Sequence, residues 1–93
     1  MTPDPAELPE DERPLRRFDG ELVHLATLLH TKRHSLGMRM SDVANNSGLS
    51  KAGLSRIERG ERTPTVRSVL ALSEMYSMRI VIENGKVIDN PTA

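Results

Sequence analysis

Basic and small side chains lie together in one short stretch of this chain. Lys51, Arg56 and Arg59 supply the cations, and Ala52 and Ser55 are small residues among them. As a helix, this stretch would present all five side chains on its outer side. Lysine and arginine donate hydrogen bonds to phosphates and to purine edges, so such a helix can enter the major groove of DNA. Residue types alone leave a second interpretation open, an ordinary helical hairpin with a solvated basic side.

Residues 40–60 predict the elements that would hold these side chains, two short helices joined by a sharp turn. Gly48 can adopt the positive φ that ends the first helix and turns the chain. Ser50 is a good N-cap for the second helix, because its hydroxyl can accept a hydrogen bond from a free backbone N–H. Leu54 and Ile57 then form the buried side of that helix. The stretch therefore has the build of a helix-turn-helix.

The sequence from Gly48 to Gly60 resembles that of XRE/Cro/C1-type helix-turn-helix regulators. It reads Gly-Leu-Ser-Lys-Ala-Gly-Leu-Ser-Arg-Ile-Glu-Arg-Gly, and after it come Pro64, Val66, Val69, Leu70 and Leu72. The run from Leu54 to Gly60 is the most specific part, and the resemblance covers about residues 22–75. It implies an all-α, four-helix lambda-repressor-like domain. It also implies a sequence-specific DNA-binding transcriptional regulator, which we expect to be a dimeric repressor of a palindromic operator.

The resemblance further implies where double-stranded DNA would be contacted. The base-reading positions of the phage repressors fall on Lys51, Ala52 and Arg56. A lysine or arginine suits guanine O6 and N7, and the alanine methyl suits the thymine methyl. Phosphate contacts position a protein without specifying a sequence, and we expect them from Arg39, Ser50, Ser55, Arg59, Arg62 and Thr63. Arg33 stands where the family carries an arginine that pairs with the glutamate of the Ile-Glu-Arg-Gly run, here Glu58, as a structural ion pair.

Two residues depart from the family pattern just before the first motif helix. The family often has Thr-Gln there, and this chain has Arg39 and Met40. Arg39 is a poor cap although it can reach a phosphate, and Met40 cannot make the hydrogen bond of the glutamine. We therefore expect Ser41 to serve as the N-cap and to shorten the helix.

Length and composition limit what else the chain could be. Its 93 residues allow one domain at most, and the absence of cysteine excludes disulfides and thiolate metal sites. Phe18 and Tyr76 are the only aromatic residues, which argues against a protein that stacks single-stranded bases or RNA. His30 and His34 lie one turn apart without a third ligand nearby, so we expect surface histidines and no metal site. No acid–base cluster or glycine-rich phosphate loop marks a reaction site, so we expect neither catalytic residues nor a cofactor.

The charge distribution is compatible with a polyanionic partner. The formal net charge is zero, yet residues 1–12 contain five acidic residues and no cation. Residues 32–67 contain eight cations and three acidic residues, so this part of the chain is strongly basic. No apolar run approaches the length of a membrane span and the N-terminus lacks a signal-peptide core. We therefore expect a soluble, cytoplasmic protein without a membrane partner.

Residues 1–17 are rich in proline and acidic residues and have little to bury, which predicts a disordered tail. The first helix should begin near Asp19, a plausible N-cap, with Phe18 and Val23 packed together as a hydrophobic staple. Its buried stripe should consist of Leu22, Leu25, Ala26 and Leu29.

The helical domain is expected to span residues 18–77, and a different kind of element should occupy residues 78–93. The fourth helix should run from about Thr65, another good N-cap, to Tyr76. It is expected to bury Val66, Val69, Leu70, Leu72 or Ser73, and Met75 or Tyr76. β-branched residues then flank Asn84-Gly85, the strongest two-residue hairpin signal, so a β-hairpin should follow.

A lone hairpin would expose apolar surface and open strand edges. We expect it to pair with that of a second subunit in a homodimer, through Met78, Ile80, Val81, Ile82, Val87 and Ile88. A hairpin folded back on its own core is the alternative. The junction Tyr76–Ile80 is similar to that of HipB-type antitoxins, and HigA-type antitoxins are similar in outline. That similarity implies, as an alternative function, an antitoxin that represses its own operon and also binds a toxin protein. A protein-interaction module without DNA binding is a further alternative.

Overall fold

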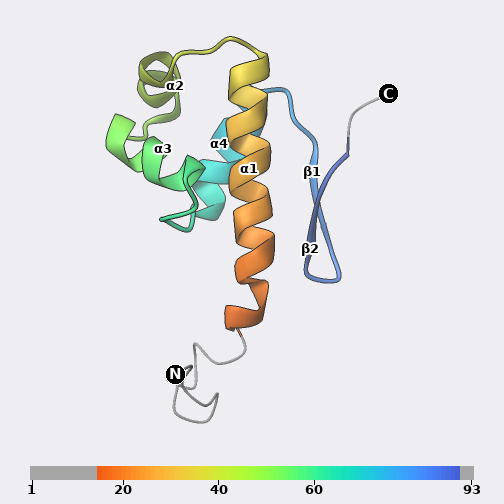
Figure 1. Cartoon of the computed structure of the whole chain (residues 1–93). Helices are drawn as coiled ribbons and strands as arrows, with labels where there is room; N and C mark the ends of the chain where they lie inside the picture. The colour runs from red at the N-terminus through yellow and green to blue at the C-terminus, as the bar shows by residue number, and fades with distance from the viewer. Residues whose placement is uncertain (1–14, 91–93) are drawn as a thin grey trace.

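The computed structural model describes residues 15–90, and residues 1–14 of the predicted tail lie outside the described part. Four helices are followed by a two-stranded hairpin (Figure 1). After a 3-10 turn, Leu15–Phe18, come α1 Asp19–Ser35, α2 Met40–Ser47, α3 Lys51–Glu58, α4 Val66–Met75, β1 Ile80–Glu83 and β2 Lys86–Asp89. This confirms the predicted fold, a small helix-turn-helix domain with a C-terminal hairpin. None of the described helices is long and apolar enough to cross a membrane.

The helices pack around one small core of mostly aliphatic side chains. α2 and α3 lie to one side of the long helix α1, and the hairpin lies to its other side (Figure 1). The buried side chains of this core are Leu25, Leu29, Val43, Leu54, Ile57, Leu72 and Tyr76. Leu54 and Ile57 are therefore on the buried side of α3, as predicted. The opposite side of α3 is left to solvent.

Local capping signals set the geometry of the helix-turn-helix. Gly48 follows α2 with a φ of 80°, a left-handed conformation that favours glycine. The Ser50 hydroxyl caps α3 by accepting a hydrogen bond of 2.9 Å from the backbone N–H of Gly53. Thr65 caps α4 in the same way, accepting from the N–H of Ser68 at 3.0 Å. These three predictions are confirmed. They could be made from the sequence because each feature depends only on neighbouring residues.

The start of α1 differs from the prediction. Phe18 occupies the N-cap position, and Asp19 is already the first residue of the helix. The Phe18 ring lies over the turn of the hairpin, since a Cβ at Gly85 would come within 2.7 Å of Phe18 Cε1. Val23 is exposed and lies toward Gly60 instead. The predicted staple between Phe18 and Val23 is therefore wrong, because the two side chains have different neighbours.

The start of α2 also differs. The helix begins at Met40, and Arg39 takes the N-cap position without a capping hydrogen bond from its side chain. The Arg39 carbonyl accepts from the N–H of Val43 at 3.1 Å. The prediction that Ser41 caps a shortened helix is therefore wrong. The Arg39 side chain stays exposed, with Nε 3.4 Å from Asp42 Oδ2.

α4 buries less of its apolar surface than the sequence predicts. Leu72 and Tyr76 are fully buried, as predicted. Val66 and Leu70 are 77% and 64% exposed, so the prediction that both are buried is wrong. Periodicity identifies an apolar stripe on a helix but does not say what covers it. Val69, in the same half of the helix, is half-buried and packs against the core.

The hairpin turns at Asn84-Gly85, where both residues have positive φ, as the predicted turn requires. β1 and β2 pair antiparallel, with Ile82 opposite Val87 and Val81 opposite Ile88. Side chains alternate between the two faces of a strand. Ile82 and Val87 therefore share the face that lies toward the helices, and Val81 and Ile88 share the outer face.

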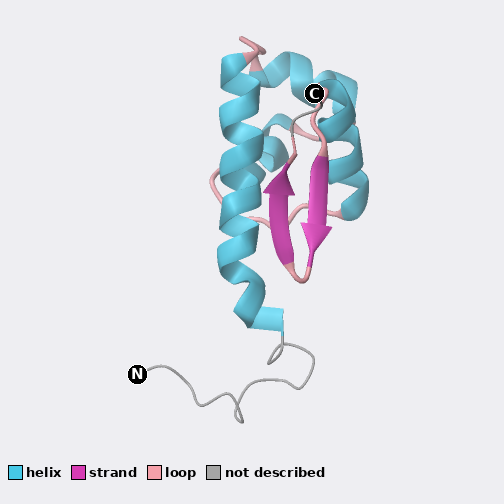
Figure 2. Cartoon of the chain, turned by 90° about the vertical axis from the view of Figure 1, so that its right-hand side faces the viewer, coloured by secondary structure: helices cyan, strands magenta, loops and turns pink. Residues whose placement is uncertain are grey.

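The hairpin folds back onto α1 of its own chain (Figure 2). The N–H of Val87 donates a hydrogen bond of 2.8 Å to Glu21 Oε2 on α1. Met78, Ile80 and Val87 pack against the helical core. Within one chain, the hairpin is thus folded back on its own core, which was the alternative to pairing with a second subunit. Pairing between two hairpins stays a prediction.

Candidate nucleic-acid interface

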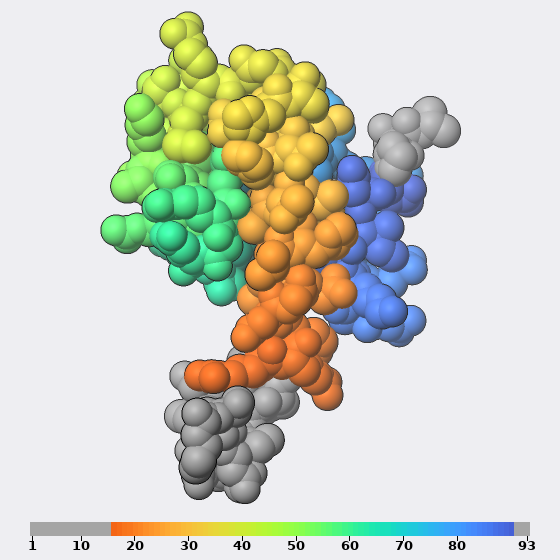
Figure 3. All heavy atoms as spheres, viewed as in Figure 1, coloured from red at the N-terminus to blue at the C-terminus, as the bar shows by residue number. Residues whose placement is uncertain are grey.

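The outer side of α3 carries the three residues predicted to read bases. Lys51, Ala52 and Arg56 are exposed, whereas Leu54 and Ile57 on the opposite side are buried. α3 and α2 form one side of the molecule, and the hairpin lies at the other (Figure 3). The outer side chains of α3 are therefore free to approach a duplex without any rearrangement of the helices.

The residues predicted to contact phosphate lie at the start of α2, at and within α3, and in the segment that follows α3. Arg39, Ser50, Arg59, Arg62 and Thr63 are exposed, and Ser55 is half-buried. Arg59 Nη2 lies 3.3 Å from Glu61 Oε2 in an ion pair, and Arg39 forms an ion pair with Asp42. Such exposed ion pairs contribute only about 0–1 kcal/mol. Neither pair would hold its arginine away from a phosphate.

Gly53 explains how Arg62 reaches the start of α3. A Cβ at Gly53 would lie 3.1 Å from Arg62 Nη1 and 2.9 Å from Ser50 Oγ. The missing side chain lets the Arg62 guanidinium lie against the first turn of the helix. The Ser50 hydroxyl accepts the capping hydrogen bond and still has its own proton to donate. The start of α3 thus brings two donors, Ser50 and Arg62, close to Lys51.

Arg33 on α1 and Glu58 at the end of α3 form a buried ion pair. Arg33 Nε donates to Glu58 Oε2 at 2.7 Å, and Nη2 donates to Oε1 at 3.0 Å. Arg33 Nη1 donates to the carbonyl of Met38 at 2.9 Å. The Glu58 side chain is only 3% exposed. Because the two partners lie on different helices, this contact fixes the orientation of α3 relative to α1.

His30 makes a further contact with the same carboxylate, which the sequence did not predict. His30 Nδ1 lies 2.7 Å from Glu58 Oε1, while half of the side chain remains exposed. His34 Nε2 lies 3.2 Å from Arg33 Nη2, so both histidines adjoin the ion pair. The spacing of three residues between His30 and Arg33 was the available signal, because it puts both on one side of α1. Within residues 15–90, no group of three or more histidine, aspartate or glutamate side chains is arranged to hold a metal ion.

Glu58 should make the stability of the domain sensitive to acid. Burial acts to raise the pKa of Glu58, but hydrogen bonds from Arg33 and His30 outweigh it and hold the pKa below its usual range. A lowered pKa in the folded state stabilises the fold above the pKa of the unfolded chain, and this contribution is lost as the pH falls. Between about pH 5 and pH 3, the urea midpoint of the wild type should therefore fall more steeply than that of Glu58→Gln. If the urea midpoints of the two proteins fall equally with pH, the Glu58 carboxylate is not the cause of the sensitivity to acid.

Tyr76 lies near the ion pair with a hydroxyl that has no hydrogen-bond partner among the described residues. Burial, and then the negative charge of Glu58, raise the pKa of Tyr76 to about 12. Leaving a buried polar group without a partner costs about 1–3 kcal/mol. Tyr76→Phe removes that group, so at neutral pH the variant should be at least as stable as the wild type.

The advantage of Tyr76→Phe should grow above about pH 10. The wild type then loses stability, because the tyrosine of the unfolded chain ionises while the folded one keeps its proton. Urea unfolding at neutral pH and near pH 11 measures both effects. A variant about 1 kcal/mol less stable than the wild type at both pH values would show that the hydroxyl has a partner.

The model of a helix-turn-helix domain family matches residues 24–78, more than half of the chain. The match covers α2, α3, α4 and most of α1, and it contains both residues of the buried ion pair. It ends before β1, so the similarity of the C-terminal part to HipB and HigA antitoxins stays a prediction. No curated protein and no solved structure is significantly similar to the chain. The chain belongs to the helix-turn-helix domain family, and its domain is that of a DNA-binding regulator.

Proposed function

We propose that the protein is a sequence-specific transcriptional repressor that binds a palindromic operator as a dimer. The observation that carries this proposal is the outer side of α3, where Lys51, Ala52 and Arg56 are exposed together. The Arg33–Glu58 contact holds that helix in place. A fixed helix with exposed cations and a small apolar residue has the groups that read guanine and thymine in the major groove.

Sequence-independent contacts would come from the residues around α3. Arg39, Arg59 and Arg62 can each donate to phosphate oxygens, and the N-terminus of α4 at Thr65 presents free backbone N–H groups. Each phosphate neutralised by a cation releases counterions, so affinity should fall steeply as salt rises. These contacts would fix the register of the duplex while α3 reads its bases.

Two copies would bind two inverted half-sites. A recognition helix in each half-site requires the two helices to lie about 34 Å apart, one turn of DNA. A protein that occupies such an operator blocks access of other proteins to it, which is the simplest route to repression. This proposal assigns the base contacts to α3 and assigns no catalytic residue or cofactor to the chain.

The experiment that tests the proposal is selection of binding sites from a pool of random duplex DNA by the full chain. We expect an enriched inverted repeat with half-site centres about 10 base pairs apart, and weaker binding at higher salt. A pool without an enriched motif would contradict sequence-specific regulation. Together with binding that salt does not change, that result would favour a protein-interaction module.

An antitoxin is a second candidate, favoured by one observation, the hairpin that directly follows α4. Such a protein would also form a stable complex with a toxin and abolish its toxicity. Purification from the native host separates the two candidates. A chain that purifies without a second protein and binds its operator at full affinity would contradict the antitoxin function.

A further inference from the structure

An apolar groove lies between α1, α4 and the hairpin. Its volume is about 220 Å³, and all eight residues that line it are apolar. Leu22 and Leu25 come from α1, Val66 and Val69 from α4, and Ile80 from β1. No charged side chain lines the groove, so it offers nothing that would select a charged ligand or peptide.

A ridge of exposed apolar side chains borders this groove. Val66, Leu70 and Ile82 are 77%, 64% and 72% exposed, the three highest values among the large hydrophobic side chains described. Val66 and Leu70 are four residues apart on α4, so they lie on one side of the helix. Ile82 lines the same groove as Val66, from the hairpin. Single exposed hydrophobic residues are common, but a contiguous patch indicates an interaction surface.

We propose that this groove and ridge form the surface on which a second copy of the chain docks. In a two-fold contact the same patch is used by both partners, so the patch must be complementary to itself. Here the ridge at Val66 and Leu70 adjoins the groove, and a two-fold axis would place the ridge of each copy in the groove of the other. This inference rests on the proposed function, because the dimer is what occupies two half-sites.

The position of the surface fits two copies on one duplex. Leu22 and Pro64 line the apolar groove, and they also line a neighbouring hollow together with Arg62 and Thr63. Arg62 and Thr63 are two of the residues assigned to phosphate contacts. A partner docked in the groove would therefore lie beside the loop that is assigned to phosphate contacts.

The size of the patch determines how strongly two copies associate. Three exposed aliphatic side chains give an area on the order of 400 Å² on each copy, the size of the largest apolar patch on a typical monomer. Both copies together would bury roughly 800 Å², less than the 1,200–2,000 Å² of stable complexes. We therefore assign a weak dimer that assembles on DNA, where two adjacent half-sites raise the effective concentration of the second copy.

The test compares binding of the full chain to duplexes with one half-site and with two. The wild type should bind the second half-site at least tenfold more tightly than the first. Leu70→Glu places a charge on the exposed ridge and should keep the affinity for one half-site while losing this tenfold gain. Ile88→Glu tests the competing surface, because Ile88 lies on the outer face of the hairpin and belongs to the residues expected to pair between two hairpins, and this variant should keep the gain.

Two results would overturn the proposal. The first is a Leu70→Glu variant that still binds two half-sites cooperatively. The second is loss of cooperativity in Ile88→Glu alone, which would move the contact to the outer face of the hairpin. Sedimentation equilibrium at millimolar protein tests the surface without DNA, so it separates this proposal from the proposed function. In the absence of DNA, the wild type should self-associate and the Leu70→Glu variant should stay monomeric. Identical average masses for the two proteins would contradict the proposed docking surface.

Discussion

Replacing Glu58 with alanine should lower the free energy of unfolding by about 3–5 kcal/mol. The change leaves the Arg33 guanidinium buried without a carboxylate, with the Met38 carbonyl and His34 as its remaining polar contacts. Small domains are stable by only about 5–15 kcal/mol, so a loss of this size removes a large part of the stability. Urea unfolding followed by circular dichroism measures the change.

Two further variants separate the buried charge from the other contacts of Glu58. Arg33→Met combined with Glu58→Leu removes both charges, and apolar replacement of a buried ion pair is often close to neutral. The double variant should therefore recover most of the lost stability. His30→Ala removes one hydrogen bond of a half-exposed side chain and should cost about 1 kcal/mol. A Glu58→Ala variant with the urea midpoint of the wild type would show that the ion pair does not hold α3 in place.

Arg56→Ala should weaken binding to the selected operator by about 10- to 100-fold. The side chain is exposed on the outer side of α3, so its removal should leave the fold intact. A hydrogen-bonded pair between arginine and guanine contributes about 1–3 kcal/mol of discrimination between bases. Binding to an unrelated duplex should change much less, because phosphate contacts supply nearly all of that affinity. Titration of both duplexes with the same protein preparation measures the two losses.

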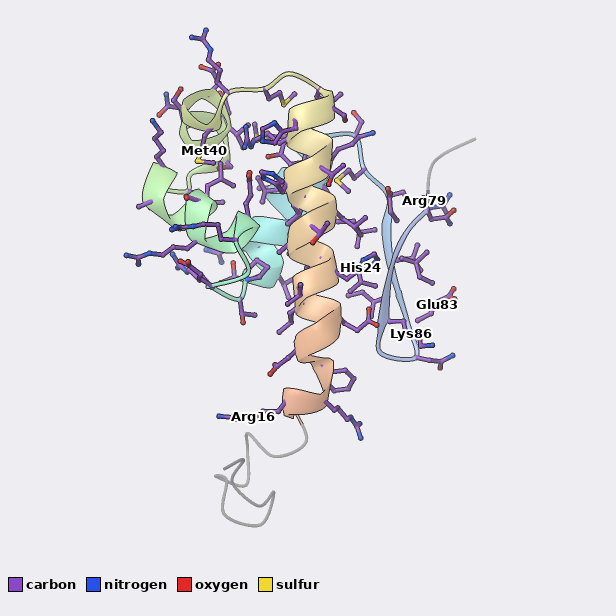
Figure 4. All side chains as sticks on the ribbon, viewed as in Figure 1. Arg16, His24, Met40, Arg79, Glu83 and Lys86 are labelled. Carbon is purple, nitrogen blue, oxygen red and sulfur yellow. The ribbon has the colours of Figure 1, made fainter. Side chains whose placement is uncertain are left out.

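Arg79→Ala is the matched control for Arg56→Ala. It removes the same charge, and Arg79 lies at the hairpin, on the other side of α1 from α3 (Figure 4). We expect a small loss of affinity, equal on the two duplexes. If Arg56→Ala also weakens both duplexes equally, Arg56 contacts phosphate and the bases are read elsewhere.

The features that the sequence predicted correctly are those with local causes. The left-handed Gly48, the Ser50 cap and the Asn84-Gly85 turn each depend on backbone conformations that a few neighbouring residues determine. Leu54 and Ile57 were placed in the core because helical periodicity fixes which side of α3 is apolar. That choice in turn fixes which residues of α3 face outward.

The features that were not predicted depend on contacts between distant parts of the chain. The hydrogen bond from Val87 to Glu21 and the contact between Phe18 and Gly85 set the position of the hairpin on α1. Neither leaves a pattern in the sequence near its own residues. The His30 contact with Glu58 left only a partial signal, since the spacing to Arg33 puts both residues on one side of α1 but does not identify Glu58 as the partner of the histidine. The sequence also did not predict that Val66 and Leu70 are exposed, because periodicity does not show which element covers an apolar stripe.

The most direct test of the claim that α3 contacts DNA is the change in backbone amide chemical shifts when a one-half-site duplex is titrated into the full chain. A half-site keeps dimerisation out of the measurement. We expect the largest changes at Lys51–Arg56, at Arg62 and at the N-terminus of α4, with little change on β2. Changes centred on the hairpin, or none at saturating duplex, would contradict the account.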